Sequence, residues 1–476
     1  MTLSNVRTRF APSPSGQLHA GNLRTALFNR LLARRHQGVF MLRIEDSDAA
    51  RSDPAAIEAL QTDLRWLGID WDAGPGIDTP SEWQQSRRRS RHAEAAAQLR
   101  TAGDAYYCFC SVERLEALRD RQQKAGMPPR YDGCCAALDP DESARRVAAG
   151  ESAVLRLRMP ATGAIAFTDR LRGAQSFAAS DLDDPVIQRA DGSFAFLFAN
   201  ALDDALMGIT DVLRGEDHLS NTPRQLVLLE RLGLAPPRYG HLSLVVDDHD
   251  APLSKRRGAP GIADFRHRGL RPEAITNYLA RLGNPALDET LRGIDDLAAG
   301  FEVARLSRRP ARFDERQLIH WQSIAMAQAP VSVLRSALTV DCIPDEAIER
   351  FITRIQPNLQ AAGELNDWAR RLFSSGDVLD DQSTARITAA GPEFFEILIA
   401  ALESADTHDW KPLRARLETA TGQRGGGLMK PLRQALTGLE HGPALGDIID
   451  LMPATIRQQR LQRAAALAAA GADRDA

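Results

Sequence analysis

The most constraining feature of this chain is its opening, in which a strand, a turn, a helix and a second strand occupy 44 residues. Residues 6–10 read as a short buried strand, and the turn-forming run 12–16 ends it. From His19 the apolar residues recur with helical spacing as far as Gly38, and residues 39–44 are too apolar for an edge strand. Such a unit predicts an α/β domain with a parallel sheet. A ligand is expected beyond the carboxyl ends of the strands.

The rest of the sequence indicates that an insertion interrupts this α/β domain and that a helical region follows it. Between 106 and 168 the pattern is irregular and contains four of the five cysteines, which is typical of an insertion. From Pro272 helical periodicity dominates. We expect strands at 195–202, 209–213 and 241–246, and helices at 54–68, 91–101 and 224–234. The expected domains are 1–102 and 194–250 (two halves of the α/β domain), 103–193 (insertion), 251–320 (connecting domain) and 321–476 (helical region).

Composition excludes several classes of protein. A chain of 476 residues has room for about three domains, and 43% hydrophobic with 26% charged residues is the balance of a globular protein. We see no run of about 20 apolar residues and no apolar signal core, which favours a cytoplasmic protein without a membrane span. Five cysteines are too few for a disulfide framework. The net charge of −4 implies that any contact with RNA is made by local basic surface.

The first candidate site is His19-Ala20-Gly21-Asn22, where the first helix begins. A helix N-terminus offers unpaired N–H groups and the positive end of a dipole, which suit a phosphate. Gly21 lets a nucleotide lie close to the backbone, and His19 can donate a hydrogen bond to a phosphate as charge develops. An ordinary turn with a surface histidine is the alternative that the local pattern leaves open.

The second candidate site is the polar loop 247–261, which contains Leu253-Ser254-Lys255-Arg256. Only four of the 59 basic residues are lysines, so a lysine in this constrained loop suggests a specific role. Lys255 can place a compact positive charge on the pyrophosphate that leaves a nucleoside triphosphate. A solvated basic loop is the alternative.

The third candidate site combines Cys108-Phe109-Cys110 with Tyr131-Asp132-Gly133-Cys134-Cys135. Two cysteine pairs in a short irregular insertion suit a structural zinc ion, which would stabilise a segment too small for its own core. Four reduced cysteines without metal are the alternative. Cys342 stands alone and reads as a core residue.

Taken together, the first two motifs resemble the two signatures of class I aminoacyl-tRNA synthetases, and the surrounding text is similar to the bacterial glutamyl-tRNA synthetase family. Seven collinear phrases carry this resemblance over essentially the whole chain: Arg-Phe-Ala-Pro-Ser-Pro (9–14), Arg-Thr-Ala-Leu-Phe-Asn (24–29), Arg-Ile-Glu-Asp-Ser-Asp (43–48), Trp-Leu-Gly-Ile-Asp (66–70), Met-Gly-Ile-Thr-Asp-Val-Leu-Arg-Gly-Glu-Asp-His (207–218), Pro-Glu-Ala-Ile-Thr-Asn-Tyr-Leu (272–279) and Pro-Leu-Arg-Gln-Ala-Leu-Thr-Gly (431–438). The resemblance implies an α/β plus α fold. It consists of a Rossmann-like parallel-sheet catalytic domain, an inserted acceptor-binding subdomain, a stem-contact domain and an all-helical C-terminal anticodon-binding region.

The implied activity is the ATP-dependent activation of L-glutamate to glutamyl-adenylate, followed by transfer to the 3′ end of tRNA(Glu). Arginine suits the two carboxylates of glutamate because its planar fork binds them bidentately. The resemblance implies Arg9 for the side-chain carboxylate, Glu45 with Ser13 for the ammonium, and Arg214 with Asn200 for the α-carboxylate. Which arginine takes which carboxylate stays open. The remaining implied residues are Phe196 in the glutamate pocket, His19 and Lys255 in catalysis, and His19, Gly21, Asn22, Glu216, Ser254, Lys255 and Arg256 at ATP.

The implied cofactors are ATP, Mg²⁺ held mainly through phosphate oxygens, and a structural Zn²⁺. For zinc, Cys108, Cys110 and Cys135 match the family. The usual fourth ligand is replaced by Ala137, so Tyr131 is the expected substitute and Cys134 the other candidate. The expected partner is tRNA, and the chain is expected to act as a monomer. Arginine-rich segments at 87–91 and 305–312 are candidate RNA contacts.

Several residues depart from the family pattern. Asn22 and Pro252 replace a histidine and a lysine of the two signatures, and Phe196 replaces a tyrosine. Asn358 stands where relatives that reject tRNA(Gln) have an arginine in the anticodon-binding helices, so we hypothesise that tRNA(Gln) is charged as well. These departures leave a catalytically impaired tRNA-binding paralogue as the alternative function. A glutaminyl-tRNA synthetase is disfavoured because its C-terminal part is a β-barrel, and no such strand pattern is present here.

Overall fold

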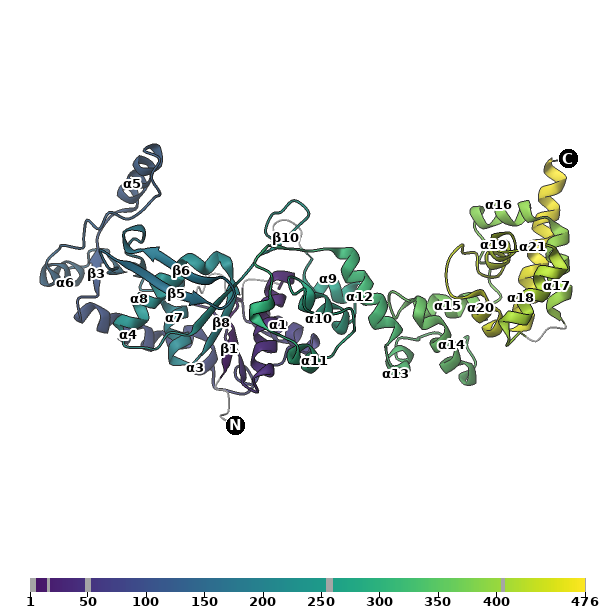
Figure 1. The fold of residues 1–476 in the computed structure, drawn as a ribbon, viewed down its shortest axis with the longest axis horizontal. Coiled ribbons are helices and arrows are strands. Elements are labelled where there is room, and N and C mark those ends of the chain that lie inside the picture. Colours follow the sequence, from purple (N-terminus) through teal and green to yellow (C-terminus); the bar gives the residue numbers. More distant parts are fainter. Residues whose placement is uncertain (1–5, 15–17, 48–52, 254–259, 404–406, 476) are drawn as a thin grey trace. The chain divides into compact units, whose positions relative to one another are not determined.

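The computed structural model describes residues 6–14, 18–47, 53–253, 260–403 and 407–475. The chain forms two compact units (Figure 1). The first consists of Met1–Arg266 and Ile275–Leu318, and the second of His267–Ala274 and Ile319–Ala476.

The first unit is built on the predicted parallel sheet. Strands β1 (Arg7–Phe10) and β2 (Val39–Leu42) pair in parallel, with helix α1 (Ala20–Arg35) as their crossover. On the other side of β1 lies β8 (Asp211–Gly215), where the Thr210 N–H donates to the Arg7 carbonyl at 2.9 Å. Strand β8 pairs in parallel with β9 (Arg238–Leu242), which sets Arg214 opposite His241. The carboxyl ends of β1, β8 and β9 therefore carry the candidate site.

Helix α1 is fixed to this sheet by both packing and hydrogen bonds. Leu23, Leu27 and Leu31 are fully buried, as their helical spacing predicts. The Asn29 amide donates to the Leu213 carbonyl of β8 at 2.9 Å. After the helix, Gly38 is required by close approach, because a Cβ there would lie 2.0 Å from the Val6 carbonyl oxygen. The turn at the start of α1 is consequently held at a defined place above the sheet.

The insertion is more regular than its sequence predicts. Strands β3 (Ala105–Cys108), β4 (Val154–Leu157) and β7 (Val186–Gln188) form an antiparallel sheet, and β5 (Ala164–Asp169) pairs with β6 (Gly173–Ala178). Helices α5 (Val112–Lys124) and α6 (Pro140–Ala148) lie beyond β3 in Figure 1. The predicted irregularity was wrong because strands of three to six residues are too short to show a clear alternation.

The strand expected at 195–202 is also wrong, because this segment belongs to helix α7 (Phe196–Leu206). Its residues 198–204 are all buried. A helix that is buried all round loses the 3.6-residue alternation, so its sequence reads like a buried strand. The helices expected near 54–68, 91–101 and 224–234 are present as α2 (Pro54–Trp66), α4 (Arg89–Thr101) and α8 (Thr222–Arg231). The first unit and its connections also contain α3 (Pro80–Trp83), β10 (Val245–Val246), α9 (Ile262–His267), α10 (Pro272–Arg281), α11 (Ile294–Ala299) and β11 (Ala311–Arg312).

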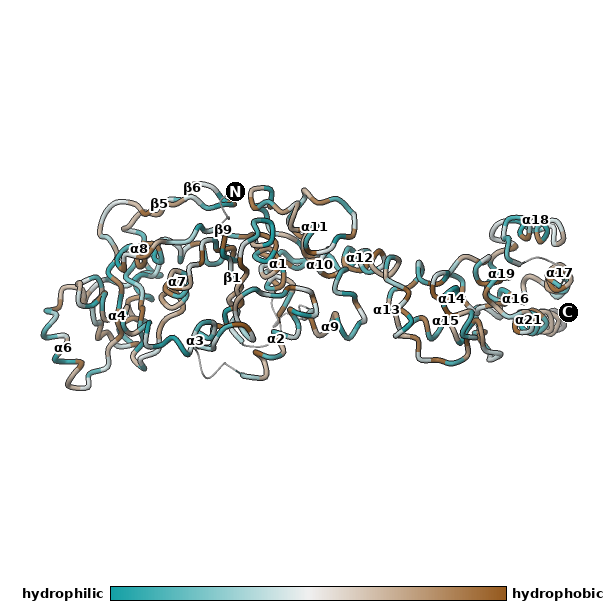
Figure 2. Tube along the Cα trace, turned by 90° about the horizontal axis from the view of Figure 1, so that it is seen from below, coloured by the Kyte–Doolittle hydropathy of each residue, from teal (hydrophilic) through white to brown (hydrophobic). Residues whose placement is uncertain are grey.

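The second unit is helical, in agreement with the sequence. Its described helices are α12 (Glu315–Ala327, which begins in the first unit), α13 (Val331–Arg335), α14 (Ile348–Ile355), α15 (Glu364–Phe373), α16 (Asp381–Ala390), α17 (Pro392–Glu403), α18 (Trp410–Thr421), α19 (Gly426–Thr437), α20 (Leu445–Leu451) and α21 (Ala454–Asp475). A continuous core that includes Phe351, Phe395 and Leu432 holds them together. Hydrophobic and hydrophilic residues alternate along the labelled helices of this unit (Figure 2). Accordingly, none of the described helices combines the length and apolar character needed to span a membrane.

Candidate active site

The turn between β1 and α1 is organised around the His19 side chain. His19 is the N-cap of α1, and its Nδ1 accepts the Gly21 N–H at 3.2 Å. The Asn22 side chain closes the cap by accepting the His19 N–H at 3.4 Å. Because Nδ1 is an acceptor here, a neutral His19 ring carries its proton on Nε2, which makes Nε2–H a donor. A Cβ on Gly21 would lie 3.1 Å from the His19 ring, so the glycine makes room for the histidine itself.

A buried network of charges lies at the ends of β1 and β2. Asp204 of α7 accepts the Arg9 Nε–H at 3.0 Å and an Arg43 Nη1–H at 2.7 Å. Arg43 is fully buried and also donates to Glu45 at 2.9 Å. The Asn200 amide donates to the same Glu45 oxygen at 2.6 Å. Two cations and two anions therefore balance in this network.

The network shifts the pKa values of its acids in opposite directions. Burial raises the pKa of Glu45, although Arg43 and Asn200 oppose the shift. Burial acts in the same sense on Asp204, but the nearby guanidinium groups of Arg43 and Arg9 outweigh it and lower the pKa of that carboxyl. Sequence reasoning missed Asp204 and the role of Arg43, although Arg43 stands two residues before Glu45 in a phrase of the resemblance.

Arg214 differs from Arg9 and Arg43 because no carboxylate among the described residues hydrogen-bonds to it. Its Nε donates to His241 Nε2 at 3.1 Å and its Nη2 to the Thr222 hydroxyl at 2.8 Å. Its Nη1 is buried and has no hydrogen-bond partner in the described part of the chain. Burial lowers the pKa of Arg214 to about 10, which leaves it a cation at neutral pH. A buried cation with an unused donor is a site for an anion.

Phe196 and Glu216 lie on elements next to Arg214. The Phe196 ring, at the start of α7, is 37% exposed and stacks on the His218 ring with centroids 5.2 Å apart. His218 belongs to a short 3₁₀ helix (Glu216–Asn221) and was not singled out from the sequence, although it ends the Gly-Glu-Asp-His phrase. Both Glu216 carboxylate oxygens are engaged, one by the Leu244 N–H at 3.0 Å and the other by Arg172. Ser13, before the start of α1, is exposed.

The signature loop falls partly outside the described residues, which exclude Ser254, Lys255 and Arg256. Its two described ends are fixed near the His19 turn. Before the gap, the Leu253 N–H donates to the Val245 carbonyl at 2.9 Å. After the gap, Gly261 forms an antiparallel bridge with His19. A Cβ on Gly21 would lie 3.9 Å from the Val245 Cβ, so β10 passes beside the same turn.

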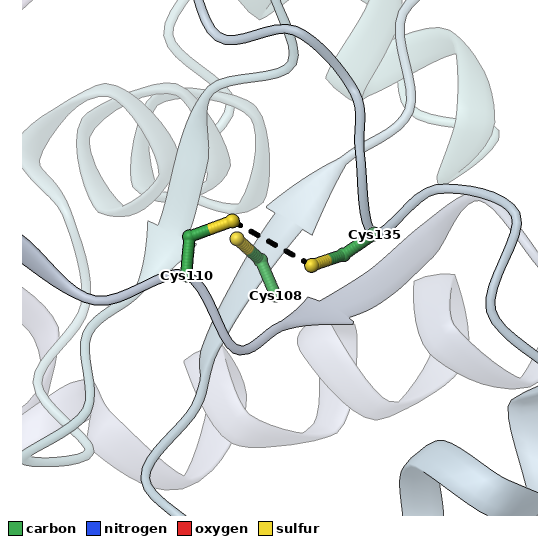
Figure 3. Close-up of side chains that lie close together, drawn as sticks. All are labelled: Cys108, Cys110 and Cys135. Atoms are coloured by element: carbon green, nitrogen blue, oxygen red, sulfur yellow. Dashed lines mark hydrogen bonds between the residues drawn. The ribbon is translucent and has the colours of Figure 1, made fainter. Parts of the chain in front are cut away.

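A separate cluster of sulfur atoms lies in the insertion. The Sγ atoms of Cys108, Cys110 and Cys135 all lie within 4.8 Å of one another (Figure 3). Cys108 ends β3, Cys110 lies between β3 and α5, and Cys135 lies in the loop that follows α5. The 3.7 Å between the Cys110 and Cys135 sulfurs is close to the about 3.8 Å that tetrahedral Zn–S bonds require. Although burial opposes ionisation, hydrogen bonds from the Phe109 backbone and the Tyr131 hydroxyl lower the pKa of Cys135 to about 7. Three convergent thiols, one of them readily ionised, fit a zinc ion.

Two groups lie where a fourth zinc ligand would be needed. The Tyr131 hydroxyl lies 3.9 Å from the Cys110 sulfur and accepts the Cys135 N–H at 3.0 Å. The Cys134 sulfur lies 3.5 Å from Cys110 and 3.7 Å from Cys135, but it does not belong to the group of mutually close donors. Both candidates therefore lie close to Cys110 and Cys135.

The second unit presents Asn358 on its surface. Gln356 is buried, and its Nε2 donates to the carbonyls of Met326, Ala327 and Ala329 at 2.8–3.0 Å. These bonds fix a 3₁₀ turn (Gln356–Asn358) in which the Asn358 side chain is exposed.

The arginine segment 87–91 is less available than its sequence suggests. Arg88 is buried and donates to Asp203 at 2.6 Å, whereas Arg87, Arg89 and Arg91 are exposed. In the segment 305–312, Arg305 and Arg312 pair with Glu302 and Asp250 at 2.9 Å and 2.6 Å.

Comparison with known proteins gives consistent matches over the whole chain. The family model "tRNA synthetases class I (E and Q), catalytic domain" matches residues 5–320, and "Anticodon binding domain" matches residues 323–465. The chain is 47% identical to "Glutamate--tRNA ligase 2" of Nitrosococcus oceani over 466 residues, which are 97% of this chain and 98% of that protein. It is also 47% identical to "Glutamate--tRNA ligase 1" of Halorhodospira halophila over 471 residues, 98% of each chain. The crystal structure of a glutamate tRNA ligase from Elizabethkingia meningosepticum in complex with its amino acid matches with a TM-score of 0.84 at 27% identity, covering 97% of this chain and 99% of that one.

Proposed function

The chain belongs to the class I tRNA synthetase family that handles glutamate and glutamine, and we infer that it is a glutamate–tRNA ligase. The enzyme activates L-glutamate with ATP to glutamyl-adenylate and pyrophosphate, and then transfers the glutamyl group to the 3′ end of tRNA(Glu). The observation that carries this function is the charge of the site. Arg9 and Arg43 are neutralised by Asp204 and Glu45, whereas Arg214 has no carboxylate partner among the described residues. The site therefore has a surplus positive charge, which suits glutamate with its net charge of about −1 at neutral pH.

Arg214 and Arg9 are proposed to bind the carboxylates of glutamate. Nη1 of Arg214 is buried and without a hydrogen-bond partner in the described part of the chain, so a substrate carboxylate would satisfy it. Arg9 uses its Nε edge for Asp204, at 3.0 Å and 3.2 Å, which leaves its two terminal nitrogens for a second carboxylate. Glutamate analogues that lack one of the two carboxylates, tested for binding to variants of Arg9 and of Arg214, would decide which arginine takes the side-chain carboxylate.

Glu45 is proposed to bind the ammonium group. Arg43 and Asn200 both donate to its Oε1 atom, at 2.9 Å and 2.6 Å, and hold the carboxylate in place. We assign Oε2 to the ammonium, with Ser13 as a further acceptor. Asn200 then acts by orienting Glu45, in place of the α-carboxylate contact that the family resemblance implies.

ATP is proposed to bind at the His19 turn. His19 and Asn22 fix the N-terminus of α1, whose positive dipole end suits a phosphate, and Gly21 makes room for the His19 ring at this turn. Ser254, Lys255 and Arg256 lie in a loop whose two described ends are fixed near this turn, which suits a cationic arm that covers the phosphates. The α-carboxylate attacks the α-phosphate in line, so the protein supplies placement and charge and no covalent nucleophile. Glu216 and a phosphate-bound Mg²⁺ complete the proposed ATP site.

Zinc is proposed to be bound by Cys108, Cys110, Cys135 and Tyr131. The sulfur spacings and the lowered pKa of Cys135 support this set. Bound zinc would fasten the loop that follows α5 to the end of strand β3. It would have no part in the chemistry of the reaction. We propose that this insertion, residues 103–193, contacts the acceptor end of tRNA.

The second unit is proposed to bind the anticodon, as the match of residues 323–465 to an anticodon-binding domain supports. Asn358 is exposed on it and lacks the guanidinium fork of an arginine, so we propose that tRNA(Gln) is charged as well as tRNA(Glu). We propose that the enzyme acts as a monomer. Because tRNA and ATP are its substrates, we propose that it acts in the cytoplasm.

Aminoacylation of purified tRNA(Glu) and tRNA(Gln), together with glutamate-dependent ATP–pyrophosphate exchange measured with tRNA present, tests this function. We expect charging of tRNA(Glu) with glutamate and slower charging of tRNA(Gln). Binding of tRNA without exchange would instead indicate the impaired paralogue, which the names of the relatives compared above do not support. In Lys255→Ala, loss of charge on the leaving pyrophosphate should slow activation about 100-fold or more. An unchanged rate of adenylate formation would remove the role proposed for Lys255.

A further inference from the structure

The buried His241 connects Arg214 to the insertion. His241 lies on β9 opposite Arg214 of β8, and its side chain is fully buried. Its Nδ1 lies 2.6 Å from Oδ2 of Asp169, the last residue of β5, and its Nε2 accepts the Arg214 Nε–H at 3.1 Å. A strand of the insertion is thus joined to a proposed substrate-binding arginine by one imidazole ring.

The hydrogen-bond pattern fixes the protonation state of His241. An arginine Nε can only donate, so the Nε2 atom of His241 has to be the acceptor and the single ring proton lies on Nδ1. That proton is donated to Asp169. The carboxylate of Asp169 is itself fixed by the N–H groups of Leu171 and Arg172 at 2.9 Å and 2.8 Å. The histidine is therefore a neutral acceptor in one defined tautomer.

This neutral acceptor determines which part of Arg214 remains for a ligand. His241 holds Nε, and the Thr222 hydroxyl holds Nη2 at 2.8 Å. The Tyr239 ring lies 4.9 Å from the guanidinium carbon and restricts the plane of the group. Only Nη1 is left without a partner among the described residues. An acidic residue at position 241 would hold Arg214 equally well but would cancel its charge, whereas a neutral histidine leaves that charge for the substrate.

We propose that His241, oriented by Asp169, is a positioning residue for glutamate recognition, which holds Arg214 so that its Nη1 and its full charge face the substrate carboxylate. The proposal rests on the proposed function, since it assigns Arg214 to glutamate. It adds that a residue of the insertion, Asp169, contributes to affinity for glutamate without touching it.

A pair of substitutions separates this role from a purely structural one. The side-chain amide of His241→Asn replaces Nδ1 and can still donate to Asp169, but it does not reach Arg214. The amide of His241→Gln replaces Nε2 and can accept from Arg214, but it does not reach Asp169. His92 is the matched control, because it is also buried and hydrogen-bonds to Asp203 at 2.9 Å, without contact to Arg214.

The assay is aminoacylation of tRNA(Glu) by the full-length enzyme, with KM measured for glutamate and for ATP, and with thermal melting as a control for folding. We expect His241→Asn to raise the KM for glutamate about 10- to 100-fold, the effect of losing a hydrogen bond to a charged group, with the KM for ATP nearly unchanged. His241→Gln should raise it less than about fivefold. His92→Asn and His92→Gln should lower the melting temperature and leave both KM values nearly unchanged.

The opposite order, with Gln more harmful than Asn, would overturn the proposal, as would equal increases in the KM for glutamate and for ATP. If His241→Asn does not fold, the pH profile of His241→Gln decides. Protonated His241 cannot accept from Arg214, so the wild-type KM for glutamate should rise once the pH falls far enough to protonate the ring, and this rise should be lost in the Gln variant. The other charged or titratable groups facing the ring are Asp169, Arg172, Arg214, His218 and Tyr239, so a rise that persists would belong to one of them. Failure of the wild type to charge glutamate at all would refute the proposed function instead.

Discussion

Neutralising Asp204 tests whether the buried charge network holds the glutamate site together. Asp204 is the acid that joins Arg9 to Arg43, and its side chain is 1% exposed. The change Asp204→Asn leaves two arginines facing Glu45 alone, so the buried network gains a net charge of +1. The NH2 group of the new asparagine is a hydrogen-bond donor, and it would meet the N–H donors of at least one arginine. The amide therefore cannot replace all the hydrogen bonds that the carboxylate accepted.

The size of the effect follows from the contacts. Asp204 accepts charged hydrogen bonds from two guanidinium groups, at 3.0 Å from Arg9 and 2.7 Å from Arg43. At about 1.5–3 kcal/mol for each hydrogen bond to a charged group, their loss comes to about 3–6 kcal/mol. This range overlaps the about 3–5 kcal/mol that removal of one partner costs a buried ion pair. We expect the free energy of unfolding of the first unit to fall by this amount.

The same substitution should weaken glutamate recognition. Arg9 loses the hydrogen bond that fixes its Nε. If about 1.5–3 kcal/mol of stabilisation is lost from the positioning of Arg9, kcat/KM for glutamate falls roughly 10- to 150-fold. The free energy of unfolding is measured by urea denaturation followed by circular dichroism. The unfolding transition whose midpoint changes in the variant is assigned to the first unit. The kcat/KM values are measured by aminoacylation with glutamate and, separately, ATP as the varied substrate.

The neighbouring Asp203 provides the control. It is equally buried, its pKa is lowered to about 2 because its partners outweigh the burial that would raise it, and it accepts from Arg88 at 2.6 Å and His92 at 2.9 Å. Asp203→Asn should therefore cost a similar free energy of unfolding without the loss in kcat/KM for glutamate. The reasoning is refuted if Asp204→Asn lowers stability but leaves glutamate kinetics unchanged, or if both substitutions impair glutamate kinetics equally.

Four further predictions concern the other sites. Glu45→Gln should raise the KM for glutamate at least about tenfold in ATP–pyrophosphate exchange and leave the KM for ATP unchanged, because the substrate ammonium and the buried Arg43 both lose a counter-charge on the glutamate side of the site; equal changes in both would argue against this contact. Metal analysis of the purified protein should find one zinc per chain, lost in Cys108→Ser and kept in Cys134→Ser, while the melting of the helical unit stays the same. Burial lowers the pKa of His241, so the unfolded state binds the proton more strongly than the folded state. The free energy of unfolding should therefore fall as the pH drops below about 6.5. Denaturation at pH 7.5 and at pH 5.5 measures this, and equal free energies of unfolding at the two pH values would contradict it. Asn358→Arg should reduce charging of tRNA(Gln) relative to tRNA(Glu), and an unaltered ratio would remove the role proposed for Asn358.

The sequence by itself determined the opening βαβ unit, the helical character of the second unit and the family to which the chain belongs. The helical spacing of Leu23, Leu27 and Leu31, between two apolar runs, predicted a parallel βαβ unit, and the structure has one. The two cysteine pairs also predicted a metal site, and the family resemblance singled out Cys108, Cys110 and Cys135, whose sulfur atoms lie within 4.8 Å of one another in the structure. Such features depend on local periodicity and residue type, which a single sequence displays directly.

Buried helix α7 is the clearest failure of that reasoning. Since residues 198–204 are buried on all sides, they carry no alternation that distinguishes a helix from a strand. The consequence reached the site, because Asn200, Asp203 and Asp204 lie on this helix. The expected strand ended at residue 202 and left Asp203 and Asp204 outside it, whereas the helix continues through both and directs one to Arg88 and the other to Arg9 and Arg43.

Only the tertiary structure decided which charged groups neutralise one another and which stay available for a substrate. Arg9 meets Asp204 across 195 residues, and His241 meets Asp169 across 72. The parallel register of β8 and β9 places the neutral imidazole of His241 beside Arg214. A shift of this register by one residue would have turned the His241 side chain to the other face of the sheet. The sequence shows that these arginines and acids exist, but hydrogen bonds form over about 3 Å, so their pairing is set by strand register and helix placement.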